Sequence, residues 1–353
     1  MPAKIAARII LLSGTLILTQ LWGDGGASHQ KRNPHFGVSG GNVNDISKLY
    51  CCSGTLGALV VAGGTPYILS NNHVLARSDQ AAVGEDISQP GMIDSGCRPA
   101  DLVADFSVAP KLGSNVDAAL ALLRPGTMDA TGFIEDIGVP AATVRLPAIG
   151  LPVAKSGRTT GFTTGTISSI NTSVRVTYQK GCGTGKKFTV SYRNQVVIGG
   201  SGFSAGGDSG SLIVTNDAAH QPVALLFAGS STSTIGNPMD EVLTKLSGAL
   251  GVPVALQGSA AVSAIVPAGP SQALVAQATE AVKQHEQGWM AHGNVAGVGV
   301  GAADENPNEA VIVVYIDRNQ GNVPDLPDQA RGFRVKRVPV EPFAALGCCA
   351  SCR

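Results

Sequence analysis

Three residue types that together perform nucleophilic chemistry stand at separate points of this 353-residue chain. Ser209 lies in the stretch GGDSGSLIV, between an acidic residue and a glycine, and an apolar run follows it. A serine hydroxyl attacks a carbonyl carbon only when a base, usually histidine, takes its proton and an acid orients that base. Ser209 is therefore a candidate nucleophile only if the fold brings a histidine and a carboxylate to it.

His73 is the candidate base because of its position. It follows the apolar run in YILSNNHVLA, where the chain is expected to turn from a strand into a short helical piece. A lone histidine in such a place ordinarily has a structural role. The other histidines lie in the N-terminal region, in a polar turn or in the C-terminal part of the chain, at His29, His35, His220, His285 and His292.

Asp117 is the candidate acid, because it begins the otherwise apolar run NVDAALALL. A carboxylate at the mouth of a buried strand must be paired or hydrogen-bonded, and an imidazole N–H would satisfy it. Asp105, in VADFSVAP, is the competing candidate.

The three segments SNNHVLA, VDAALALL and GGDSGSLIV together resemble the catalytic segments of trypsin-like (chymotrypsin-fold) serine proteases. The order His73, Asp117, Ser209, with intervals of 44 and 92 residues, also matches that family and neither the subtilisin nor the α/β-hydrolase order. CSGTLGALV and GRTTGFTTGTI add a similarity to a bacterial group related to the plant narrow-leaf protein. The resemblance covers about residues 45–250.

The resemblance implies a serine endopeptidase that forms an acyl-enzyme on a polypeptide substrate and needs no cofactor or metal. Ser209 would be the nucleophile, His73 the general base and Asp117 the orienting acid, with an oxyanion hole formed by the backbone N–H groups of Gly207 and Ser209. Asp208 would be buried and paired with a basic group that the sequence does not identify.

The resemblance also implies a substrate pocket with Phe203 at its base and Gly229 and Ser230 on one wall. No acidic residue offers itself there, so we expect a neutral pocket for small or apolar side chains.

Ser211 departs from the family pattern, which has a second glycine after the nucleophile. His73 is not followed by a cysteine, and no activation cleavage site stands out. A catalytically silent binding or scaffold protein on the same fold is the alternative function. An esterase of the α/β-hydrolase type would need Gly-x-Ser-x-Gly, which Ser211 breaks.

The composition, and the glycines that separate the apolar runs, indicate the elements that must position these residues. Hydrophobic residues are 44%, charged residues 14%, and 45 glycines separate many short apolar runs. Such spacing predicts a mainly β domain, here a chymotrypsin-like double β-barrel. Lysine plus arginine equals aspartate plus glutamate at 25 each, which gives no reason to expect nucleic acid as a partner.

The chain divides into segments by composition. Positive charge, a short apolar run and small residues predict a signal peptide over 1–27, hence a secreted or periplasmic protein without stable membrane insertion. The remaining segments are a Gly-, Pro- and Asn-rich stretch 28–44, the protease-like domain 45–252 closed by a helix at 239–250, a linker 253–270, a small α+β module 271–345, and a cysteine-containing tail 346–353.

The α+β module is expected to contain a helix at 271–290, three strands, and a helical turn in LPDQAR between the last two strands. GVGVGA at 297–302 formally fits a dinucleotide fingerprint, but a loop with Pro307 follows it where that motif needs a helix. The sequence does not predict the oligomeric state.

Seven cysteines leave at least one free or paired between chains. A bridge among Cys51 or Cys52, Cys97 and Cys182 is expected. The pair Cys349 and Cys352 is interpreted as part of a poorly ordered tail that can form a disulfide, because no second pair of zinc ligands is visible.

Overall fold

The computed structural model describes residues 28–183, 185–321 and 325–352, without the side chains of 348–350. The predicted signal peptide, 1–27, lies outside the described residues. Within them the chain is mainly β, as predicted, and its strands form two large sheets.

Seven short strands form the first barrel, and all their pairings are antiparallel. β2 and β3 are separated only by Gly57 and act as one bent strand. The pairs β1–β2, β3–β4, β4–β7, β7–β6, β6–β5 and β5–β1 then close the sheet on itself. The strands are β1 (Val38–Asn42), β2 (Tyr50–Leu56), β3 (Ala58–Ala62), β4 (Thr65–Ser70), β5 (Asp86–Gln89), β6 (Asp101–Val108) and β7 (Ala119–Leu123).

The second barrel repeats this strand order. β8 pairs with β9, β9 with β10, β10 with β13, β13 with β12, β12 with β11 and β11 with β8, all antiparallel. The expected chymotrypsin-like double β-barrel is therefore confirmed by the strand pairing. Its strands are β8 (Pro152–Gly157), β9 (Gly161–Gln179), β10 (Lys187–Gly199), β11 (Leu212–Thr215), β12 (Pro222–Gly229) and β13 (Ser233–Pro238).

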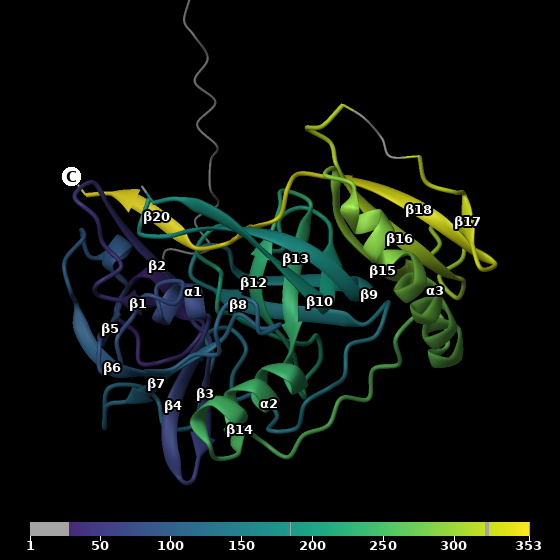
Figure 1. Cartoon of the computed structure of the whole chain (residues 1–353). Helices are drawn as coiled ribbons and strands as arrows, with labels where there is room; N and C mark the ends of the chain where they lie inside the picture. Colours follow the sequence, from purple (N-terminus) through teal and green to yellow (C-terminus); the bar gives the residue numbers. More distant parts are fainter. Residues whose placement is uncertain (1–27, 184, 322–324, 353) are drawn as a thin grey trace, which may run out of the picture.

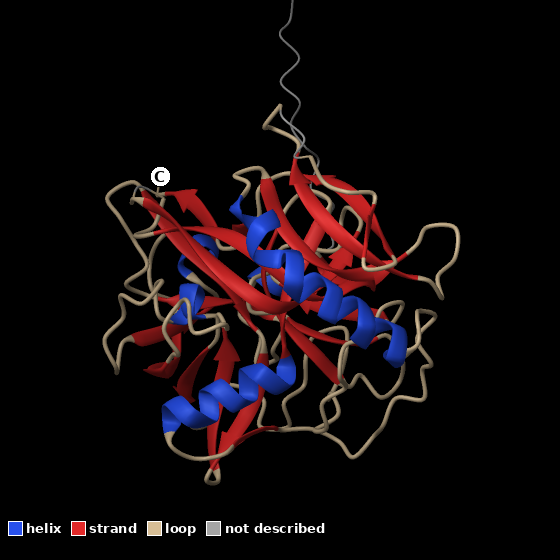
Figure 2. Ribbon diagram, turned by 45° about the vertical axis from the view of Figure 1, so that its right-hand side comes forward, coloured by secondary structure: helices blue, strands red, loops and turns tan. Residues whose placement is uncertain are grey.

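Helices are few in the described residues. α1 (Asn72–Leu75) follows β4, where a short helical piece was expected, and the 3-10 turn η2 (Met92–Asp94) follows β5. α2 (Met239–Leu250) spans the helix predicted at 239–250 and buries Met239, Val242 and Leu246 against the first barrel. In Figure 2 the two long helices lie on the outside of the strands.

The remaining elements are β14 (Val254–Leu256), α3 (Gln272–Ala291), β15 (Val295–Ala302), β16 (Ala310–Asp317), β17 (Gln329–Ala330), β18 (Phe333–Val340), β19 (Ala344–Ala345) and β20 (Cys348–Ser351). The helix and three strands expected after residue 270 are present. The helical turn expected in LPDQAR is wrong, because Gln329 and Ala330 form a strand that folds back on β18. Positive φ angles of 52° at Arg331 and 83° at Gly332 make the tight hairpin turn between them.

The C-terminal unit continues the second barrel. β15 pairs with β9, and α3 and β15 share one apolar core with barrel residues such as Ile167, Ile198 and Phe203. The segment 253–270, expected to be a linker, packs along the surface, since β14 pairs with β3 and Ser263 Oγ donates to Asp217 at 2.6 Å. Figure 1 shows β15, β16 and β18 beside β9.

No helix among the described residues is long and apolar enough to cross a membrane.

The tail at 346–353, expected to be poorly ordered, contains β20, which pairs with β2 of the first barrel. Disulfides join Cys51 to Cys97 and Cys52 to Cys182, as expected for this group of cysteines. Cys352 Sγ also lies at bonding distance from Cys97, so Cys97 has two alternative partners.

Candidate active site

His73 and Asp117 are brought together by the first barrel. His73 is in α1 at the end of β4, and Asp117 precedes β7, which pairs with β4. The distance from His73 Nδ1 to Asp117 Oδ2 is 2.6 Å, and the backbone N–H of His73 donates to Asp117 Oδ1 at 3.2 Å. The Asp117 carboxylate is fully buried, so these donors take the place of water.

Tyr178, on β9 of the second barrel, also contacts this carboxylate. Its hydroxyl donates to Asp117 Oδ2 at 2.9 Å and lies 2.7 Å from the Tyr192 hydroxyl. Burial raises the pKa of Tyr178 well above its usual value, so the hydroxyl stays protonated and remains a donor. Sequence reasoning missed Tyr178, since VRVTYQ carries only a strand pattern.

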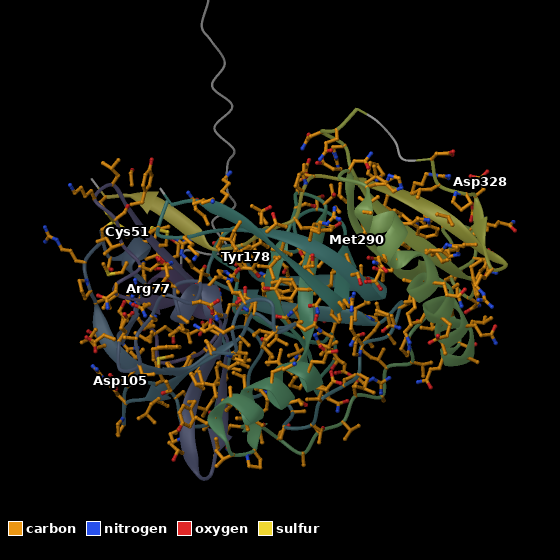
Figure 3. All side chains as sticks on the ribbon, in the orientation of Figure 1. Cys51, Arg77, Asp105, Tyr178, Met290 and Asp328 are labelled. Carbon is orange, nitrogen blue, oxygen red and sulfur yellow. A yellow bond between two sulfur atoms is a disulfide. The ribbon has the colours of Figure 1, made fainter. Side chains whose placement is uncertain are left out.

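Asp105, the competing acid, lies elsewhere. It is on β6, and its carboxylate accepts two hydrogen bonds from the Arg124 guanidinium, one of them at 2.5 Å. Figure 3 shows Asp105 toward the edge of the first barrel and Tyr178 near the centre of the molecule.

Ser209 lies in the loop between β10 and β11, which two glycines shape. Gly207 and Gly210 have φ angles of 102° and 98°, a region that favours glycine. A Cβ on Gly210 would also lie 2.2 Å from the Thr55 carbonyl oxygen. The first barrel holds this loop from β2, where Thr55 N–H donates to the Ser209 carbonyl at 2.8 Å and the Thr55 hydroxyl to the Gly207 carbonyl at 2.8 Å.

The Ser209 hydroxyl is buried and donates to the Phe227 carbonyl at 3.2 Å. His73 Nε2 is buried and has no hydrogen-bond partner in the described part of the chain. Catalytic hydrogen bonds often tighten only in the reacting complex, and the unpaired Nε2 leaves His73 an acceptor for the Ser209 hydroxyl.

Asp208 is fully buried, and its basic partner, which the sequence did not identify, is Lys155 on β8. The Lys155 Nζ lies 3.6 Å from Asp208 Oδ2 and donates to the Gly161 carbonyl at 2.8 Å. Asp208 also accepts hydrogen bonds from the backbone N–H groups of Thr159 and Ala205 at 2.8 and 2.9 Å. Burial lowers the pKa of Lys155, and the Asp208 charge opposes that shift.

Ser211 has a structural role in the same loop. Its hydroxyl donates to the Asp208 carbonyl at 2.7 Å, and its backbone N–H donates to the same oxygen at 3.0 Å. A Cβ on Gly157 would lie 2.3 Å from the Ser211 hydroxyl, so this side chain occupies space left by a glycine of β8.

A pocket opens beside His73, lined also by Asp45, Arg77, Tyr178 and Gly347. Burial raises the pKa of the Asp45 carboxyl to about 6, against the opposing charges of Arg77 and His73. The charge on this wall of the pocket therefore changes at mildly acidic pH.

Of the residues expected to form the substrate pocket, Phe203 is buried in the core of the second barrel, and its carbonyl accepts a hydrogen bond from Thr163 at 2.7 Å. Gly229 pairs with Ala344 of the C-terminal segment. Ser230 N–H donates to the Ser233 carbonyl at 2.8 Å, within its own turn.

The Gly207 amide, one of the two expected oxyanion donors, has a partner. It donates to the carbonyl oxygen of Leu346 at 2.6 Å. A backbone carbonyl of the chain itself therefore lies where the resemblance expects a substrate oxygen.

No protein-family model matches the sequence, and no curated protein sequence matches it. Solved structures do. A glutamic-acid-specific serine protease, described as using a histidine triad in substrate binding, has a TM-score of 0.43 and 21% identity, with 63% of this chain and 98% of that chain covered. Nocardiopsis protease (NAPase) has a TM-score of 0.41 and 17% identity, covering 62% and 98% of the two chains. Thermobifida fusca protease A has a TM-score of 0.40 and 18% identity, with 62% of this chain and 98% of that chain covered.

Proposed function

We propose that this protein is a serine endopeptidase. The observation that carries the proposal is the buried His73–Asp117 pair, 2.6 Å apart, beside a loop whose Gly207 amide holds a peptide carbonyl at 2.6 Å. An oriented imidazole and an amide donor for a carbonyl oxygen are the two requirements of acyl transfer to a serine.

In this proposal His73 takes the proton of the Ser209 hydroxyl as that oxygen attacks a peptide carbonyl. Asp117 keeps the imidazole in the tautomer with the proton on Nδ1 and stabilises its cationic form. Tyr178 is a positioning residue, because its hydroxyl fixes the carboxylate from the second barrel. The Gly207 amide stabilises the oxyanion, an interaction whose loss typically costs about 10²–10³ in turnover.

Export is part of the proposal. The first 27 residues have the layout of a signal peptide, and disulfides such as Cys52–Cys182 form and persist in oxidising compartments. The protein would then act on polypeptides outside the cytoplasm.

Labelling with a fluorophosphonate probe tests the proposal, because the probe reacts with an activated serine. The wild type, Ser209→Ala and His73→Ala are compared. The Leu346 carbonyl occupies the Gly207 amide in this structure, so the probe is also used on Leu346→Asp. This variant is designed to weaken the binding of residue 346 at the site and so to give the probe access to Ser209. We expect labelling that is lost in Ser209→Ala and reduced at least about 10³-fold in His73→Ala.

A silent binding protein is the second candidate, favoured by one observation. The Ser209 hydroxyl donates to the Phe227 carbonyl, and within the described residues His73 Nε2 accepts no hydrogen bond from it. If neither the wild type nor Leu346→Asp is labelled, this candidate replaces the endopeptidase.

A further inference from the structure

The C-terminal segment crosses the candidate active site from one barrel to the other. β19 pairs antiparallel with β12, matching Ala344 with Gly229 and Ala345 with Ala228. Two residues later β20 pairs antiparallel with β2 of the first barrel. Figure 1 shows this yellow segment running from β18 to β20. An extended peptide that adds a strand to a sheet edge is a common mode of peptide recognition.

Leu346 and Gly347 are the two residues between these strands. The Leu346 N–H donates to the Phe227 carbonyl at 3.1 Å, the same oxygen that accepts from the Ser209 hydroxyl at 3.2 Å. The Leu346 carbonyl accepts from the Gly207 amide. The Leu346 backbone is thus bound on both sides by groups of the candidate site.

Gly347 lies against the imidazole. A Cβ built on Gly347 would be 3.3 Å from His73 Cδ2 and 3.7 Å from His73 Nε2. Gly347, the residue whose nitrogen would leave if the Leu346–Gly347 bond were cut, therefore lies against the imidazole that would protonate it.

The Leu346 side chain packs against the apolar core cluster that contains Phe203. A Cβ on Gly229 would lie 3.1 Å from Leu346 Cδ1, so glycine at 229 leaves the space that this side chain needs. Gly229, one of the residues expected to form the substrate pocket, thus adjoins a medium-sized aliphatic side chain, and Phe203 belongs to the same apolar cluster.

We propose that the chain is its own substrate and that Ser209 cleaves the Leu346–Gly347 bond within the same molecule. This inference rests on the proposed endopeptidase function. It also assigns the substrate class, namely extended peptides with leucine or a similar aliphatic residue before the cleaved bond.

The reaction consumes one water molecule. Ser209 Oγ bonds to the Leu346 carbonyl carbon, its proton passes to His73 Nε2, and that proton then goes to the Gly347 nitrogen as the C–N bond breaks. Water hydrolyses the resulting ester and leaves a Leu346 carboxylate and a Gly347 amine.

The released heptapeptide Gly347–Arg353 has one described covalent attachment. Cys352 lies at bonding distance from Cys97, which can alternatively bond Cys51. When Cys97 pairs with Cys352, cleavage therefore leaves the peptide joined to the first barrel until that disulfide is reduced.

Intact mass after reduction tests the inference on the full chain. We expect the wild type to lose residues 347–353 and Ser209→Ala to keep them. Because the bond is already held at the site, the reaction is intramolecular, and the loss is expected to be first order, with a half-time that does not change over about a 100-fold dilution.

Leu346→Asp places a carboxylate in an apolar pocket, so we expect cleavage at residue 346 to slow by about 100-fold or more and probe labelling of Ser209 to rise. The matched control is Leu146→Asp, at a leucine with 64% exposure outside the site, which should be cleaved like the wild type.

The two proposals fail separately. A chain that the probe labels at Ser209 but that stays intact through Arg353 overturns the self-cleavage and leaves the endopeptidase standing. Equal loss of the heptapeptide from Ser209→Ala also overturns self-cleavage, since another protease would be responsible. If neither the wild type nor Leu346→Asp is labelled, the endopeptidase itself fails.

Discussion

At the scale of single residues, two buried tyrosines differ in the hydrogen-bond partners of their hydroxyls. Tyr178 donates to the Asp117 carboxylate, whereas the Tyr192 hydroxyl contacts the Tyr178 hydroxyl. Tyr178→Phe should lower the free energy of unfolding by about 1.5–3 kcal/mol, since it removes a hydrogen bond to a charged group, and slow Ser209 labelling. Tyr192→Phe, the matched control, should cost about 0.5–1.5 kcal/mol and leave labelling near the wild-type rate. Urea unfolding and labelling rates measure both, and equal losses would contradict the positioning role.

Residue spacing predicted the pairing of His73 with Asp117, because a carboxylate that begins a buried strand needs a partner. Tyr178 and Lys155 could not be found in the same way. Both lie on strands of the second barrel whose sequences carry only a β pattern, and their partners are more than 50 residues away. Such contacts depend on how the two barrels close, which local pattern does not encode.

At the scale of elements, β8 supports the Ser209 loop through a buried ion pair. Lys155 and Asp208 are both fully buried, so removing the lysine charge leaves a buried carboxylate that keeps its hydrogen-bond donors but loses its cationic partner. Lys155→Met should therefore lower the free energy of unfolding by about 3–5 kcal/mol and slow Ser209 labelling. Lys245→Met, at an exposed position of α2, is the control and should change stability by less than about 0.5 kcal/mol. Urea denaturation checks the comparison, and a loss from Lys155→Met as small as the control's would refute this support.

The elements also show that two asparagines expected to separate strands do not do so. TGTISSI and VRVTYQ predict separate strands, as do FTVSY and NQVVIG, but they form the continuous strands β9 and β10. Asn171 and Asn194 lie at the expected breaks with φ angles of 51° and 59°, where the β9–β10 register also shifts. The asparagines therefore mark β-bulges and not chain reversals, a difference that depends on the partner strand.

At the scale of the whole molecule, the C-terminal unit is part of the fold of the second barrel. The edge of β9 is covered by β15, and Val298, Val300 and Trp289 lie in the same apolar cluster as Ile167 and Ile198. Composition predicted a linker and a separate module here, because a Pro- and Gly-rich stretch precedes a new helix. The sequence pattern does not say which strand edge the helix and its strands cover, because that edge exists only once the barrel has assembled.

Two truncations of different extent test this dependence. A chain ending at Val252 lacks α3 and β15, so it exposes the β9 edge together with the barrel side chains of the shared cluster, and we expect it to aggregate or to bind a hydrophobic dye without a cooperative melt. A chain ending at Phe343 keeps every member of that cluster except Leu346. It also keeps Phe343, whose side chain is 1% exposed. It should remain soluble and unfold in one transition. Size-exclusion chromatography and thermal unfolding compare the two, and a soluble, cooperative chain ending at Val252 would show that the double barrel folds alone.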